Sequence, residues 1–201
     1  MNDVIVYETG ARLYLNITNR CPCDCVFCIR KKANGINIGE SLWLAKEPSF
    51  EEIIAATENK DVGSYDEIVI CGYGEPTERF ELLPIIAKYI KGKYPGSKIR
   101  LNTNGLSDLI NGKPTAKDLS AYIDAVSISL NASNKNDYFN VCRPAFGEKS
   151  FDALLSFAGD CKKHFSDTCF TVTDMLSSSE LSSCKNLCEK LGIRLRVRQS
   201  L

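Results

Sequence analysis

The sequence predicts an α/β fold of the TIM-barrel type, in which six parallel strands form an incomplete (β/α)6 barrel around a polar lumen. Strand-like and helix-like segments alternate along the chain, and several strands alternate between apolar and polar residues. The chain has 201 residues, whereas a complete eight-fold barrel takes about 250. No internal repeat, low-complexity segment or linker divides it, so we expect a single domain over residues 1–201.

Six segments have the composition of short strands, namely residues 12–17, 66–71, 98–103, 124–130, 168–173 and 193–198. Most of them alternate, as IRLRVR at 193–198 does, which gives the sheet one apolar and one polar face. The helices pack on the apolar face. The polar side chains of the other face line a hydrated lumen, because burying them without hydrogen-bond partners costs free energy. An antiparallel sheet with one face in water alternates in the same way, but helices between most of the strands argue against it.

Helix signals separate these strands. Ser49 and Glu52 form a capping box, Pro84 suits a helix start, and Gly192 suits a helix end. We expect helices at about residues 51–60, 84–93, 115–118, 151–165 and 180–191.

The composition excludes several classes of protein. The 25 basic and 25 acidic residues cancel, which disfavours nucleic acid as a partner, and no apolar run is long enough to cross a membrane. The N-terminal residues lack the pattern of a secretory signal, so we expect a cytoplasmic protein. Its ten cysteines would then stay reduced, and this favours metal or redox chemistry over disulfides.

Four cysteines follow the first predicted strand within eight residues. Cys21, Cys25 and Cys28 have the spacing C-x3-C-x2-C, and three thiolates can hold an iron–sulfur cluster or a zinc ion. Both usually take four protein ligands, but Cys23 lies too close to its neighbours to serve easily as the fourth. The single histidine, His164, lies in a predicted helix far along the chain. We therefore expect a cluster with one iron free of protein ligands.

At this motif the sequence resembles the radical SAM (S-adenosylmethionine) superfamily. GYGEP at 72–76 is similar to the superfamily's Gly-Gly-Glu-Pro motif, with Tyr73 in place of the first glycine. The resemblance implies that Gly74 lets the backbone approach SAM closely and that Glu75 accepts from its ammonium group. LNTNG at 101–105 and SISLNA at 127–132 fall where relatives bind SAM. With Arg196 from the last strand, the expected SAM-binding residues are Phe27, Gly74, Glu75, Asn102, Asn104, Ser129, Asn131 and Arg196.

The resemblance also implies the reaction and the cofactors. One [4Fe–4S] cluster per chain, held by the three cysteines, would cleave SAM reductively to a 5′-deoxyadenosyl radical that takes hydrogen from a small polar or anionic substrate. An external electron donor such as flavodoxin or ferredoxin would reduce the cluster. CPCDCVFCIR and SLWLAKEPS, taken together with the other motifs, resemble the small radical SAM proteins associated with TatD-type nucleases, which implies association with such a nuclease.

Arg194, Arg196 and Arg198 share one face of the last predicted strand, about 6.6 to 6.8 Å apart. Pointing inward, Arg196 could pair with the SAM carboxylate and another of the three with a carboxylate or phosphate of the substrate. The alternative is a solvated edge strand, since charges also protect sheet edges.

Two other functions remain open: activation of a protein partner by formation of a glycyl radical, and structural zinc binding. Asn16 could line the lumen or serve as a structural hydrogen-bonding group. We expect Cys184 and Cys188 to be small buried residues of a helix rather than a second metal pair, Cys23 to be accessory, and His164 to be a surface residue.

Overall fold

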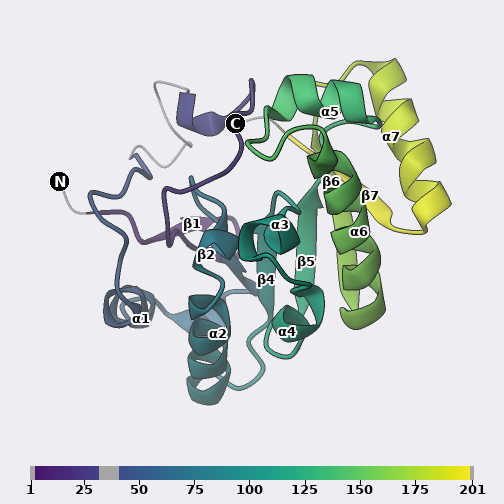
Figure 1. The fold of residues 1–201 in the computed structure, drawn as a ribbon. Coiled ribbons are helices and arrows are strands. Elements are labelled where there is room, and N and C mark those ends of the chain that lie inside the picture. Colours follow the sequence, from purple (N-terminus) through teal and green to yellow (C-terminus); the bar gives the residue numbers. More distant parts are fainter. Residues whose placement is uncertain (1–2, 32–40, 200–201) are drawn as a thin grey trace.

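The computed structural model describes residues 3–31 and 41–199, which form one sheet with strands in the order β1 to β7 (Figure 1). Strands β2 to β7 are parallel, and β1 pairs with β2 in the antiparallel direction. The edge strands β1 and β7 do not pair with each other, so the barrel is open, as predicted. The strands are β1 (Val6–Thr9), β2 (Arg12–Leu15), β3 (Glu67–Ile70), β4 (Ile99–Thr103), β5 (Ala125–Ser129), β6 (Asp167–Thr173) and β7 (Arg194–Arg198).

Strand β1 was not predicted, so the sheet has seven strands rather than six. Thr9 pairs with Arg12, which leaves Gly10 and Ala11 as a two-residue turn. Gly10 adopts a φ of 58°, the conformation that such tight hairpin turns require and that glycine adopts without strain.

All five predicted helices are present, and the structure has two further helices between them. Ser49 and Ser177 both form complete capping boxes, and Gly192 ends its helix in the left-handed conformation. Helix α2 begins two residues before Pro84, which still lies in the first turn, where its missing N–H costs no bond. The helices are α1 (Phe50–Glu58), α2 (Leu82–Lys93), α3 (Ser107–Asn111), α4 (Ala116–Ser120), α5 (Lys135–Cys142), α6 (Lys149–His164) and α7 (Ser178–Leu191), of which α3 and α5 were not predicted. Three short 3-10 turns, η1 (Ile29–Lys31), η2 (Val62–Ser64) and η3 (Pro76–Arg79), complete the described elements.

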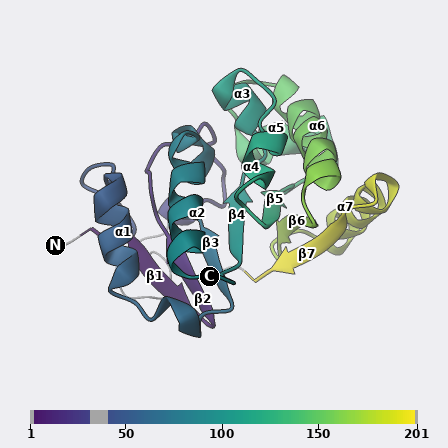
Figure 2. The same ribbon diagram turned by 90° about the horizontal axis from the view of Figure 1, so that it is seen from below.

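The helices cover the outer face of the curved sheet (Figures 1 and 2). Leu15, Leu101 and Ile128 of the strands are buried there in one core with side chains of α2 and α6, such as Ile86 and Leu154. The polar face is turned inward, so the predicted apolar and polar faces are confirmed. In the described ranges no helix has the length and apolar character needed to cross a membrane.

Ion pairs close the lumen at the amino-terminal ends of the strands. Arg100 of β4 lies 2.7 Å from Glu67 of β3 and 2.7 Å from Asp167 of β6. Arg12 and Arg194 extend this arrangement to β2 and β7 at 3.2 and 2.6 Å. We call these five residues the floor. The side chains of Arg100 and Glu67 are only 6% and 7% exposed, so every charge of the central pair is compensated inside the protein.

Candidate active site

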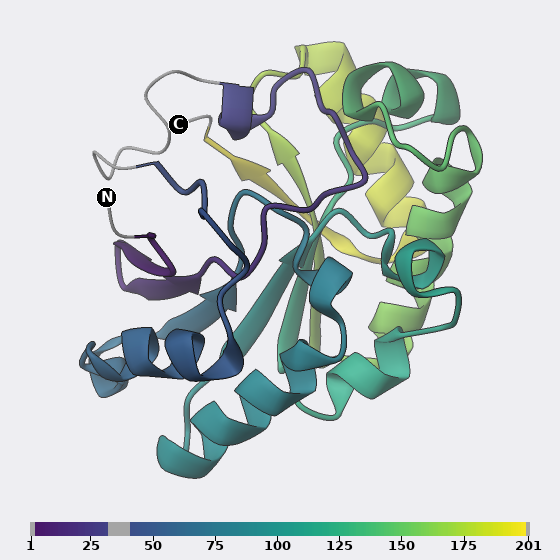
Figure 3. The ribbon, with the colours of Figure 1, turned by 60° about the vertical axis from the view of Figure 1, so that its left-hand side comes forward.

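The cysteine loop, residues 16–31, crosses the sheet at the carboxyl-terminal ends of the strands (Figure 3). On one side the N–H groups of Gly74 and Glu75 donate to the carbonyls of Thr18 and Arg20, at 3.0 and 2.7 Å. On the other side the loop contacts the last turn of α5 and the segment after it. Val26 N–H donates to the carbonyl of Val141, and Cys23 forms a β-bridge with Pro144. Two distant parts of the chain therefore fix the shape of this loop.

The four cysteines of the loop fall into two groups by burial. Cys23 is 5% exposed and belongs to the apolar core, whereas Cys21, Cys25 and Cys28 are half-buried. A hydrogen bond from Cys23 lowers the pKa of Cys21, although burial raises it. A hydrogen bond from Cys142 is the largest cause that lowers the pKa of Cys25, to about 4. Two of the three half-buried thiols are therefore stabilised as thiolates, the form that ligates metal.

Each half-buried sulfur has a hydrogen-bond donor in the surrounding chain, and the donor to Cys21, Asn104 Nδ2, also lies 3.8 Å from Cys23 Sγ. Asn104 Nδ2 lies 3.9 Å from Cys21 Sγ, Arg30 Nε donates to Cys28 Sγ at 3.3 Å, and Cys142 is hydrogen-bonded to Cys25. Sequence reasoning missed Arg30 and Cys142. A basic residue two positions after a cysteine is a usable signal for the former, but nothing in the sequence connects Cys142 with the loop.

Within residues 3–31 and 41–199, no three His, Cys, Asp or Glu side chains are grouped so that they could hold one metal ion.

Gly74 is required by contacts within the chain. A Cβ atom at this position would lie 2.3 Å from the carbonyl oxygen of Thr18 and 2.7 Å from that of Arg20. The expected close approach of backbone is therefore to the cysteine loop, and this contact explains the glycine without any ligand. Contact of Gly74 with SAM stays a prediction.

Glu75 is 3% exposed, and its carboxylate is bound by the chain itself. Oε1 accepts from Thr77 N, Thr77 Oγ1 and Thr103 Oγ1 at 3.1, 2.8 and 2.7 Å, and Oε2 accepts from Asn104 N at 2.6 Å. Burial raises the pKa of Glu75, and these hydrogen bonds offset part of that rise. Oε2 accepts a single hydrogen bond from the described residues and therefore has room for a further donor.

Tyr73 and Asn16 have structural contacts at the rim of the lumen. Tyr73 is buried against Leu42, and its ring lies edge-on to Trp43 at 5.4 Å. Asn16 Nδ2 donates to the carbonyls of Val4 and Leu42, and Oδ1 accepts from Tyr73 N. Of the two roles left open for Asn16, the structure supports the structural one.

Several polar atoms around the lumen are buried without a partner in the described part of the chain. They are Asn102 Oδ1, Asn131 Oδ1, Arg196 Nε and Arg198 Nε. Asn131 is 6% exposed and has a φ of 59°, which is uncommon for a residue with a side chain. Buried polar atoms are normally hydrogen-bonded, so this group of unpaired atoms fits a polar ligand.

The remaining predicted residues are placed as follows. Phe27 is half-buried against the core, and Ser129 accepts a hydrogen bond from Arg198 at 3.4 Å. Cys184 and Cys188 are buried in the core and His164 is exposed, as expected.

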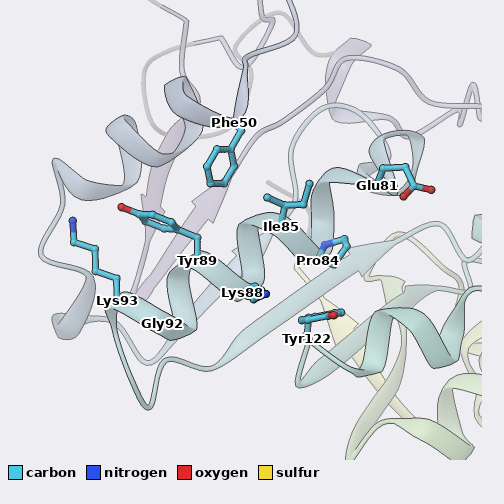
Figure 4. A pocket seen from close by; sticks show the side chains of 9 residues that line it. All are labelled: Phe50, Glu81, Pro84, Ile85, Lys88, Tyr89, Gly92, Lys93 and Tyr122. Atoms are coloured by element: carbon cyan, nitrogen blue, oxygen red, sulfur yellow. The ribbon is translucent and has the colours of Figure 1, made fainter.

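A groove of about 900 Å³ lies on the outside of α2, away from this site (Figure 4). Ile85, Tyr89 and Tyr122 are among the residues that line it, and none of its lining residues belongs to the cysteine loop. Its place on the outer surface excludes it as part of the lumen site.

The structure is similar to those of three proteins, each larger than this chain. They are anSMEcpe with bound AdoMet (18% identity, TM-score 0.65), a radical SAM methyltransferase from Sphaerobacter thermophilus (17%, 0.61) and the FeFe-hydrogenase maturase HydG from Carboxydothermus hydrogenoformans (19%, 0.67). The alignments cover 94%, 96% and 94% of this chain and 50%, 57% and 44% of the others, so the chain spans about half the length of these proteins. At these identities the similarity shows the fold alone.

Comparison by sequence identifies the family. No curated protein matches the chain significantly. The sequence model of the radical SAM superfamily matches residues 15–180, which include the cysteine loop and the strands β3 to β6. This match confirms the predicted class of enzyme, and the chain belongs to the radical SAM superfamily.

Proposed function

We propose that Cys21, Cys25 and Cys28 hold a [4Fe–4S] cluster, and that the enzyme uses SAM to abstract hydrogen from a small polar or anionic substrate. The observation that carries the proposal is the set of three half-buried thiols at the carboxyl-terminal end of the strands, each beside a hydrogen-bond donor. When bound, the cluster supplies the electron that cleaves SAM into methionine and a 5′-deoxyadenosyl radical.

The residues around the thiols support the cluster. Hydrogen bonds from Asn104, Cys142 and Arg30 stabilise negative charge on the three sulfurs and orient them. Arg30 also donates to the carbonyls of Cys23 and Asn19, so the same guanidinium holds the backbone of the loop. Cys23 takes part as a packed core residue and not as a ligand.

The unpaired polar atoms support SAM binding beside the cluster. Asn102 Oδ1 and Asn131 Oδ1 can accept from SAM, Glu75 Oε2 can accept from its ammonium group, and Arg196 Nε can donate to its carboxylate. Phe27, Gly74, Asn104 and Ser129 complete the proposed SAM site. Each of these assignments is tested by the SAM affinity of the corresponding variant.

We also propose the domain organisation, the location and the partners of the protein. We assign residues 1–201 to one radical SAM core domain in the cytoplasm, although residues 1–2, 32–40 and 200–201 lie outside the described part. A flavodoxin or ferredoxin would supply electrons. The motif combination supports a place among the TatD-nuclease-associated proteins, with such a nuclease as a partner.

Anaerobic reconstitution with iron and sulfide tests the proposal. We expect about four irons per chain, and 5′-deoxyadenosine after addition of SAM and dithionite. Cys21→Ser, Cys25→Ser and Cys28→Ser should lose the iron, whereas Cys23→Ser should retain it. Cys184→Ser, in the core far from the loop, is the matched control. A colourless protein that binds zinc through the same cysteines would refute the proposal.

A further inference from the structure

Arg196 and Arg198 differ from the arginines of the floor in their partners. Arg100 and Arg194 pair with carboxylates, whereas no described residue forms an ion pair with Arg196 or Arg198. Nη2 of Arg196 donates to Ser127 Oγ at 3.3 Å, and Nη2 of Arg198 donates to Ser129 Oγ at 3.4 Å. Nε of both is buried without a partner. Within the described part of the chain, these two guanidinium groups of the lumen therefore have no ion-pair partner.

No carboxylate is among the groups that act most strongly on Arg198. These groups are Cys71, Arg196, Tyr14 and Cys169. Burial and the like charge of Arg196 lower the pKa of Arg198. Keeping two positive groups unpaired in a half-buried lumen costs free energy, and protein function is the usual reason for retaining such an arrangement.

SAM can compensate only one of the two arginines, because it has a single carboxylate. If Arg196 binds that carboxylate, as proposed above, Arg198 is left without an anion. We infer that the substrate carries an anionic group, a carboxylate or a phosphate, and that Arg198 binds it. This inference rests on the proposed function, because it assigns the SAM carboxylate to Arg196.

Groups beside Arg198 extend the site. Cys71 acts on Arg198, and its side chain is hydrogen-bonded to Asn102, which the proposed function assigns to SAM, so the two sites adjoin. The rings of Tyr7 and Tyr14 stack at 4.9 Å on the same side of the lumen, where Tyr7 Oη donates to the carbonyl of Cys71. The predicted substrate therefore combines an anionic group with polar atoms that hydrogen-bond beside it.

Thermal unfolding of the SAM-bound holoenzyme tests the inference, with inorganic phosphate and acetate as probes at constant ionic strength. A ligand that binds only the folded state raises Tm. We expect phosphate, acetate or both to raise Tm of the wild type and of the control Arg194→Gln, and the rise to disappear in Arg198→Gln. Arg198→Gln removes an unpaired charge and should fold; Arg198→Lys, which keeps the charge, should recover part of the rise. The response to each probe distinguishes a phosphate site from a carboxylate site.

The SAM dissociation constant distinguishes the role of Arg196 from that of Arg198. We expect the SAM dissociation constant to rise at least about tenfold in Arg196→Gln and to change less than about threefold in Arg198→Gln, since a lost charge-assisted contact is worth on the order of tenfold. An equal anion effect in wild type and Arg198→Gln, no anion effect in wild type, or a tenfold loss of SAM affinity in Arg198→Gln would overturn the inference. Formation of 5′-deoxyadenosine without added anion tests the proposed function separately.

Discussion

Asn104 N–H donates to Glu75 Oε2 at 2.6 Å, and this hydrogen bond joins the loop after β3 to the end of β4. The amide of the same asparagine lies 3.9 Å from Cys21 Sγ, so Glu75 also orients a donor to a proposed cluster ligand. Glu75 therefore acts through the chain around it as well as through any contact with SAM.

Glu75→Gln should destabilise the protein by about 1–3 kcal/mol, because the amide NH₂ of glutamine would face donors where the carboxylate accepted four hydrogen bonds. Urea unfolding measures this change. Glu78→Gln, in the same loop but at a half-buried pair with Arg20, is the control and should change stability by less than about 1 kcal/mol. Equal stabilities of the two variants would contradict this role.

Gly74→Ala should displace the cysteine loop, because the new methyl group would meet the carbonyl oxygens of Thr18 and Arg20. Overpacking of this kind costs about 1–3 kcal/mol. We expect lower stability together with a lower iron content after reconstitution. The control is Gly92→Ala in α2, where no atom lies within 4 Å and where alanine should stabilise the helix by up to about 1 kcal/mol. Full iron content in Gly74→Ala would contradict the expectation.

Asn131 combines a positive φ with an unpaired buried Oδ1, which predicts opposite effects on stability and on binding. Asn131→Gly relieves the backbone strain and should leave stability equal or higher, while SAM affinity falls. Asn131→Ala keeps the strain without the amide and should lose about 1 kcal/mol relative to Asn131→Gly. Thermal unfolding checks the effect on stability and calorimetric titration with SAM checks the effect on binding; unchanged SAM affinity in both variants would refute the assignment.

Acid should lower the free energy of unfolding by protonating Glu67 and Asp167, the two carboxylates of the floor. Burial raises the pKa of Glu67, but Arg100 and Lys98 outweigh this and lower it to about 2; Arg194 and Arg100 likewise lower the pKa of Asp167 to about 2. Because both pKa values are depressed on folding, the stabilisation is complete above the ordinary values of 4.5 and 3.8 and is lost as pH falls toward 2.

Urea unfolding at about pH 6 and about pH 3 measures this loss. Wild type should lose more stability over that interval than Glu67→Gln, which has no carboxylate to protonate. Parallel pH dependence of the two proteins would show that the floor does not contribute.

Alternation along the strands predicted the two faces of the sheet, because side-chain direction in a strand depends only on position. The helix signals between the strands predicted that the strands are parallel. The β1 hairpin was missed although Gly10 marks its turn, since the segment is short and β1 forms the edge of the sheet. Helices α3 and α5 were missed because they are short, and α5 has only a weak apolar face.

The site was predictable where it depends on local spacing, as for Cys21, Cys25 and Cys28. The contact of Cys142 with Cys25 depends on how α5 packs, and no pattern along the chain encodes it. The same is true of Glu75, whose donors come from two strand ends, and of Gly74, whose small size serves the cysteine loop. Sequence motifs identify these residues but not the neighbours that require them.

The buried pair of Arg100 and Glu67 also affects the order of events during turnover. Their buried side chains lie across the lumen at the amino-terminal ends of the strands. Reactants and products then share the opposite end of the lumen, where the cysteine loop crosses the sheet (Figure 3). Products must leave before new reactants can bind, so slow product release would limit the turnover rate even if bond cleavage were fast.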